Sequence, residues 1–87
     1  MATLTANING NWSDIKTSLS LTEDVKYTMQ NFTKTGLYIF EGAEPSKDSL
    51  GIFTPAHELI NITPTTGNGM WVRTKDDTAG AVVVTPS

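Results

Sequence analysis

The chain has 87 residues, no cysteine and a formal net charge of −3, and these values exclude several classes of protein. A chain of this length forms one small domain with a thin core, which is usually supplemented by disulfides, a metal or association with other chains. Disulfides require cysteine, and a structural zinc site would have His57 as its only nitrogen ligand. Association with other chains is therefore the expected supplement.

The distribution of charged and apolar residues limits the expected partners and location. The six basic residues are scattered and form no basic stripe, so nucleic acid is not expected as a partner. Nothing approaches the ~20 apolar residues that a membrane-spanning helix needs. The first twelve residues lack the charged start and apolar run of a secretory signal. We expect a soluble protein that is made in a cytoplasm, without an export signal or a membrane partner.

The first quarter of the chain is predicted to be extended. ATLTANI, residues 2–8, has the composition of a strand, but the Asn-Gly-Asn run that follows favours turns, so residues 1–12 are also a candidate N-terminal arm. WSDIKTSLSLT, residues 12–22, combines a helical spacing of apolar residues with the alternation of a strand. We predict an extended segment or a single helical turn there.

The middle of the chain has an apolar period of two, which predicts half-buried strands. VKYTMQN, residues 25–31, alternates apolar with polar side chains. LYIFEG, residues 37–42, places its aliphatic side chains on one face and Tyr38 and Phe40 on the other. Two further short strands are expected at residues 50–54 and 57–63.

The end of the chain, MWVRTKDDTAGAVVVTPS, is predicted to be a hairpin of residues 70–75 and 81–85, and TTGNG before it signals another hairpin. A connection of four residues places Val83 on the face of Met70, and one of five places it on the face of Trp71. In both registers each face of the hairpin carries large apolar groups. The face of Met70 and Val72 is the natural core, so the other face is left to be covered by something else.

These elements amount to seven or eight short strands with turn signals every 8–12 residues or so, without a convincing helix. The pattern predicts an all-β fold, a small antiparallel β-sandwich or barrel of jelly-roll type. Residues 1–87 are expected to form this single domain.

The face of the last hairpin that carries Trp71 and Arg73 is the candidate contact surface, because Trp, Tyr and Arg are enriched at the energetic centres of interfaces. The alternative is that both faces lie inside a two-sheet sandwich, with Trp71 in its core. The candidate interface residues are Trp71, Arg73, Tyr38, Phe40, Val83 and Trp12.

The sequence offers no arrangement of catalytic or metal-binding residues. His57 is the only histidine, and its neighbour Glu58 would point to the other side of a strand. No serine lies in a G-x-S-x-G turn, and a thiol nucleophile is excluded. The acidic pairs at residues 23–24 and 76–77 are interpreted as turn residues that bond their own backbone. We expect no enzyme activity, no catalytic residue, no cofactor and no metal.

Several motifs resemble those of small structural proteins in tailed bacteriophages. They are Y-x-x-Q-N at residues 27–31, a middle loop followed by PAHEL at residues 55–59, G-M-W-V-R at residues 69–73, and a valine-rich last strand. Together they extend from about Tyr27 to Val84, roughly two-thirds of the chain. The chain resembles capsid decoration (cement) proteins or small head accessory subunits. Such proteins are short β-sandwiches that assemble symmetrically, often as trimers.

The resemblance implies a phage virion subunit that forms a homo-oligomer, a trimer, and bridges neighbouring subunits of the capsid. Its partners would be other copies of the chain and the major capsid protein or another virion component. It would be made in the host cytoplasm and located in the virion. The alternative is a carbohydrate- or receptor-binding β-sandwich or a small tail or fibre component, in which exposed aromatic rings stack on sugars.

Overall fold

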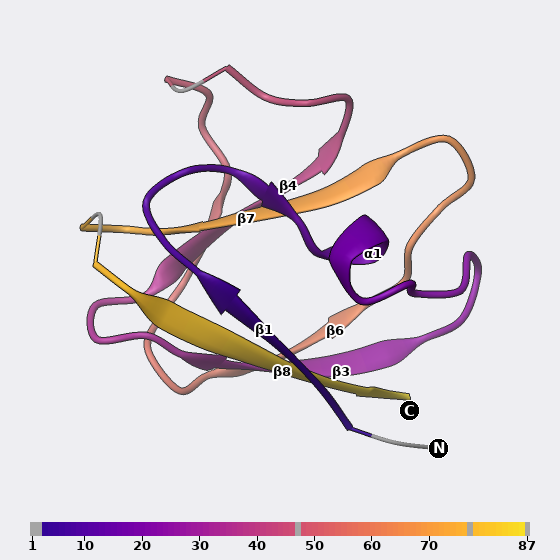
Figure 1. The fold of residues 1–87 in the computed structure, drawn as a ribbon, viewed down its shortest axis with the longest axis horizontal. Helices are drawn as coiled ribbons and strands as arrows, with labels where there is room; N and C mark the ends of the chain where they lie inside the picture. Colours follow the sequence, from indigo (N-terminus) through magenta and orange to yellow (C-terminus); the bar gives the residue numbers. More distant parts are fainter. Residues whose placement is uncertain (1–2, 47, 77, 87) are drawn as a thin grey trace.

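In the computed structural model, which describes residues 3–46, 48–76 and 78–86, the chain forms two four-stranded antiparallel sheets packed face to face (Figure 1). One sheet has the strand order β1-β8-β3-β6 and the other β2-β7-β4-β5. The strands are β1 Leu4–Ile8, β2 Ser13–Asp14, β3 Tyr27–Phe32, β4 Leu37–Gly42, β5 Ile52–Thr54, β6 Leu59–Ile62, β7 Gly69–Thr74 and β8 Gly80–Pro86, and a one-turn helix, α1, spans Ile15–Ser18. The predicted all-β sandwich of short strands is confirmed.

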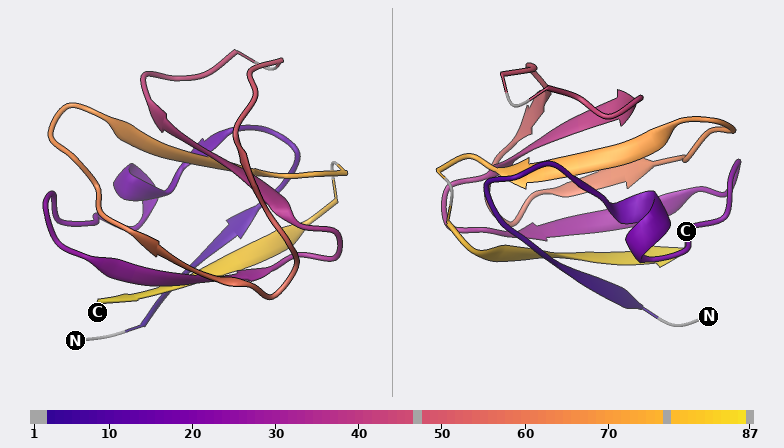
Figure 2. Two further views of the ribbon diagram at one scale, coloured as in Figure 1. Left: turned by 180° about the vertical axis from the view of Figure 1, so that it is seen from behind. Right: turned by 45° about the horizontal axis from the view of Figure 1, so that its top comes forward.

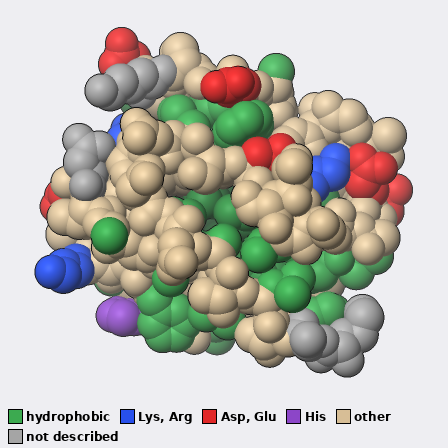
Figure 3. Space-filling view, in the orientation of Figure 1, with side chains coloured by type: hydrophobic (Ala, Val, Ile, Leu, Met, Phe, Trp, Pro, Cys, Tyr) green, Lys and Arg blue, Asp and Glu red, His purple; other side chains and the backbone are tan. Residues whose placement is uncertain are grey.

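The core lies between the two sheets and is built from the strand positions that the two-residue alternation places on one face. In β4, Leu37 and Ile39 are buried while Tyr38 and Phe40 are half-buried on the outside. Figure 3 shows apolar side chains gathered between the two layers. The buried apolar residues are Ala6, Ile8, Ile15, Leu21, Tyr27, Met29, Leu37, Ile39, Ile62, Met70, Val72, Val82 and Val84.

The connections between strands define the topology. Apart from β4 and β5, which pair with each other, every two strands that follow one another in the sequence belong to opposite sheets. The chain therefore crosses repeatedly between the layers, as the views in Figure 2 show. This strand order is that of an eight-stranded jelly roll, in which two Greek keys form a pair of facing sheets.

The predicted C-terminal hairpin is wrong. β7 pairs with β2 and β4, whereas β8 pairs with β1 and β3 in the other sheet. Both strands are central in their sheets, so each hydrogen-bonds two neighbours that are distant in the sequence. Because β7 and β8 do not pair, neither of the two registers considered for Val83 opposite Met70 or Trp71 occurs. Met70 and Val72 do point into the core, as predicted, and Val82 and Val84 reach the same core from the opposite sheet.

The TTGNG segment forms the predicted turn but not the predicted hairpin. The Asn68 N–H donates to the Thr65 carbonyl at 3.3 Å, and Gly67 has a φ of +81°, which favours glycine. The turn leads from β6 in one sheet to β7 in the other. Turn chemistry specifies a local reversal of the chain and leaves the pairing partner to the tertiary structure.

The N-terminal segment is part of the sandwich. β1 pairs with β8 along its length, and Ala6 and Ile8 lie in the core, so this segment is a sheet strand rather than an arm. The chain then reaches β2 and the single turn α1, where an Asp14 carboxylate oxygen accepts the Lys16 N–H at 3.1 Å as the N-cap. The prediction of an extended or single-turn segment at residues 12–22 is confirmed.

Candidate functional site

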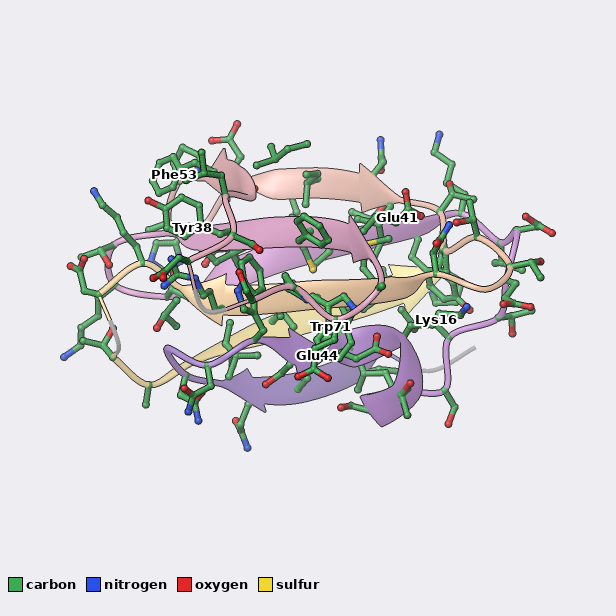
Figure 4. All side chains as sticks on the ribbon, turned by 90° about the horizontal axis from the view of Figure 1, so that it is seen from above. Lys16, Tyr38, Glu41, Glu44, Phe53 and Trp71 are labelled. Carbon is green, nitrogen blue, oxygen red and sulfur yellow. The ribbon has the colours of Figure 1, made fainter. Side chains whose placement is uncertain are left out.

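The outer face of the β2-β7-β4-β5 sheet carries most of the side chains that the sequence analysis selected. In the pairing of β4 with β7, Phe40 lies opposite Trp71, and Tyr38 lies opposite Arg73. All four are half-buried and point away from the core, so the alternative that places Trp71 between the sheets is excluded. We call this surface, with Trp12 and Phe53, the aromatic face; Figure 4 shows Tyr38, Phe53 and Trp71 on it.

Arg73 lies at the centre of a row of rings on the aromatic face. Its guanidinium carbon is 5.3 Å from the centroid of the Trp12 ring and 4.9 Å from that of Tyr38. The Tyr38 and Phe53 rings follow with centroids 5.6 Å apart. Both guanidinium distances fall within the range in which a ring face attracts a cation. The row holds the positive charge in a fixed place on the surface.

Trp12 ties the connection between β4 and β5 to the aromatic face, and Trp71 bonds to the end of β4, where this connection begins. The Trp12 indole N–H donates to the Ser46 carbonyl at 3.0 Å, and the Trp71 indole N–H donates to the Gly42 carbonyl at 3.1 Å. The Trp12 ring also meets Phe40 edge-on, with centroids 6.1 Å apart. Part of the aromatic face is therefore covered by the protein's own loop, and both indole N–H groups are satisfied within the chain.

Two glycines provide the space in which the tryptophan rings lie. A Cβ on Gly69 would be 2.5 Å from the Trp71 indole nitrogen, and one on Gly51 would be 2.7 Å from the Ile39 carbonyl oxygen and 3.1 Å from the Trp12 ring. Neither position tolerates a side chain without a shift of its neighbours. The close approach of backbone and ring makes the aromatic face a packed layer rather than a set of loose side chains.

Trp12 also forms one wall of a shallow pocket of about 200 Å³. The pocket is lined by Gly10, Asn11, Trp12, Glu44 and Pro45. It therefore combines an aromatic ring with an amide and a carboxylate.

Val83 does not belong to the aromatic face. It lies on the outer side of the other sheet, between Thr5 of β1 and Gln30 of β3, and it is half-buried there. The sequence analysis grouped Val83 with Trp71 because it expected β7 and β8 to pair. The structure places the two residues on opposite outer faces of the sandwich.

The sequence analysis missed a second surface, at the side of the sandwich where β5 and β6 lie. Each of these strands is the last in its sheet. Leu50 is 90% exposed, Ile52 72% and Leu59 63%. A shallow groove of about 220 Å³ runs between the strands, lined by Ile52, Phe53, Thr54, Pro55, Glu58, Leu59 and Ile60. We call this surface the β5–β6 edge.

The outward position of Leu59 could have been read from the alternation in HELINIT, which puts it opposite the face of Ile60 and Ile62. The position of β5 and β6 at the edges of their sheets could not have been predicted from the sequence. It follows from the order of strands in the sheets, which no local pattern encodes.

The buried side chain of Asn31 fixes the β5–β6 edge to the rest of the sandwich. Its amide nitrogen donates to the carbonyls of Thr54 at 3.0 Å and Pro55 at 2.8 Å, and its amide oxygen accepts the Thr33 N–H at 3.0 Å. The Asn31 carbonyl also accepts the His57 N–H at 2.7 Å. One residue of β3 thus holds both the end of β5 and the chain that leads into β6.

The acidic residues and the histidine considered for catalysis or metal binding are exposed wherever the structure describes them. His57 is exposed, has a φ of +65° and packs edge-on against Phe32, with centroids 5.7 Å apart. Lys16 donates to Glu23 at 2.6 Å, and this hydrogen bond holds the pKa of the Glu23 carboxyl below its usual value. Asp76 is exposed, and its neighbour at position 77 lies outside the described residues. Within the described residues, no group of three or more His, Asp or Glu side chains is placed to hold a metal ion.

Comparison with known proteins gave no match in any of three searches, against protein-family models, curated proteins and solved structures. Among the described residues, no helix has the length and apolar character needed to cross a membrane.

Proposed function

We propose that this domain is a structural subunit of a phage virion, a capsid decoration protein that self-associates and bridges neighbouring shell subunits. The observation that carries the proposal is the amount of apolar side chain left outside the core. Leu50, Ile52 and Leu59 are each more than 60% exposed, and Phe32 and Phe53 are each 44% exposed. Contiguous exposed apolar surface marks sites of interaction with other proteins.

The fold is consistent with this role. The jelly roll is an architecture that viral capsid proteins use, and its two sheets leave two outer faces and two sides open for contacts. Motifs that resemble those of phage decoration proteins lie on β3, on β7 and in the chain that enters β6. The role requires no catalytic group, since assembly depends on surface burial alone.

The mechanism would be repetition of modest contacts. Each copy of the domain buries its exposed apolar side chains against another copy and presents further surface to the shell. A symmetric oligomer that binds a symmetric shell makes several contacts at once, so the combined attachment is far stronger than one contact. A trimer fits this mechanism because its symmetry matches the threefold positions of a shell.

The second candidate function is a carbohydrate- or receptor-binding module, which lectin jelly rolls exemplify. The pocket beside Trp12 favours it, because an aromatic ring with the amide of Asn11 and the carboxylate of Glu44 provides the stacking and hydrogen-bonding groups that sugars require. The aromatic face would then be a binding platform rather than the support of a loop.

Two measurements separate these functions. Light scattering gives the mass in solution, where the 9.4 kDa chain should appear as a multimer, and cosedimentation with phage shells that lack their decoration protein should deplete it from the supernatant. A glycan array tests the alternative. A monomer that ignores shells and binds a saccharide, with the Trp12→Ala variant losing that binding, would establish the second function and reject the first.

A further inference from the structure

We propose that the β5–β6 edge, rather than the aromatic face, is the surface on which a second copy of this chain docks. The inference rests on the self-association proposed above and specifies where it occurs. It reassigns the contact that the sequence analysis placed at Trp71 and its neighbours.

The first argument is the pairing of the strands. β5 pairs only with β4, and β6 pairs only with β3, among the described strands. Each therefore presents one side of its backbone to the outside. An edge strand of this kind is a template for pairing with another strand, and soluble proteins blunt it with short strands, lysine, proline or a covering loop. β5 and β6 are short, with three and four residues, but neither Ile52–Thr54 nor Leu59–Ile62 contains a lysine or proline.

The second argument is the exposed apolar side chains. Leu50, Ile52 and Leu59 are the three most exposed large apolar residues of the described chain, and all three lie on or beside β5 and β6. The aromatic face differs, because its large side chains other than Phe53 are half-buried and its two indole N–H groups are already bonded to carbonyls. More apolar surface remains to be gained by covering the β5–β6 edge.

The third argument is the position of the edge. The side of the sandwich formed by β5 and β6 faces the viewer in the left view of Figure 2. Residues of both strands line the same groove, so a single partner can cover both strands at once.

The fourth argument favours a second copy as the occupant. Among the described residues that line the groove, Glu58 alone is charged, so two identical edges meet with little like-charge repulsion. Antiparallel strands can pair with themselves about a twofold axis, which gives each copy the same contact and makes the assembly a dimer instead of the trimer that the resemblance implies. The Asn31 hydrogen bonds hold the edge in place before docking, which lowers the entropy cost of association.

The test uses charge substitutions at two exposed positions of the edge. Leu59→Asp and Ile52→Asp should each convert the multimer to the single-chain mass in light scattering. Leu59→Thr, which keeps β-propensity, should weaken association at least tenfold. Thr5→Asp is the matched control, since it adds the same charge at an exposed strand position of β1 and should leave the mass unchanged. Far-ultraviolet circular dichroism verifies that each variant is folded.

Hydrogen exchange provides a second readout, because strand pairing protects backbone amides whereas side-chain contact alone does not. The amides of β5 or β6 should exchange more slowly as the protein concentration rises. The absence of native cysteine also allows Leu59→Cys to act as a unique thiol, which should form a disulfide-linked dimer under mild oxidation.

The outcomes distinguish failure of this inference from failure of the proposed function. If the multimer survives Leu59→Asp and Ile52→Asp, the edge is not the self-association site, although the structural role stands. If protection of β5 and β6 appears only when shells are added, the occupant is a shell strand and the inference is rejected. A wild-type chain that remains monomeric at every concentration and ignores shells rejects both.

Discussion

Replacement of Asn31 should remove a large share of the stability of this domain. The Asn31 side chain is fully buried and bonds to groups in three places, namely Thr33 in the next turn, Thr54 at the end of β5, and Pro55 beyond it. β3 and β5 belong to different sheets, so this amide is a polar link between the two layers. Asn31→Ala leaves the partners in place without their hydrogen bonds.

The magnitude follows from the groups left behind. The bonds to Thr54 and Thr33 are buried, and a buried group without a partner costs about 1–3 kcal/mol. Two such groups give an expected loss of about 2–6 kcal/mol in the free energy of unfolding, to which the small cavity adds. A domain of this size has a total of about 4–13 kcal/mol. Asn31→Ala is therefore expected to remove between about a sixth of the stability and all of it.

Urea unfolding followed by tryptophan fluorescence measures this loss. Gln30→Ala is the control, because Gln30 is the adjacent residue in β3 and makes an exposed side-chain bond to the His57 carbonyl at 3.2 Å. It should cost less than about 1 kcal/mol, as most surface substitutions do. A loss below about 1 kcal/mol for Asn31→Ala itself would contradict the view that this side chain joins the two sheets.

Three further predictions concern the aromatic face and the polar contacts of α1. Gly69→Ala should destabilise the domain by about 1–3 kcal/mol and alter the near-ultraviolet circular dichroism, because the new methyl group displaces the Trp71 ring. Unchanged spectra would contradict the packing described for that ring. Trp71→Phe removes the hydrogen bond to Gly42, the last residue of β4, and should cost about 0.5–1.5 kcal/mol. Proteolysis of the connection that follows Gly42 should increase. Resistance equal to that of the wild type would show that this bond does not hold the start of the connection. The lowered pKa of Glu23 means that its ionised form stabilises the fold, so Glu23→Gln should lower the unfolding midpoint at neutral pH. The difference in midpoint between this variant and the wild type should shrink as the pH falls below the ordinary glutamate pKa of about 4.3. A difference that persists in acid would exclude the ion pair with Lys16 as the cause.

The sequence by itself determined which side chains point inward. Alternation is a local property, because successive residues of a strand point to opposite faces whatever the strand pairs with. On this basis Leu37 and Ile39 were placed on one face of β4, and Met70 and Val72 were placed on the core face of β7; all four are buried. The same reasoning put Trp71 on the face opposite Met70 and Val72 but left open whether that face was outside, and the structure shows that it is.

Strand pairing was decided only by the tertiary structure. The turn signals before β7 and after it predicted two hairpins, yet β6, β7 and β8 pair with partners elsewhere in the chain. A turn reverses the chain over a few residues, but it does not specify whether the next strand joins the same sheet or the facing one. That choice depends on which arrangement buries the inward side chains of all eight strands together.

The candidate docking surface likewise depends partly on the sequence and partly on the tertiary structure. The sequence identified aromatic and basic residues at Tyr38, Trp71 and Arg73 because their types are common at interfaces, whereas the β5–β6 edge depends on strand order. The exposure of Leu59 and Ile52 results from their strands being the last in each sheet, with no neighbour beyond them. Local chemistry thus set the face of each side chain, and the global packing of the two sheets set which side chains remain uncovered.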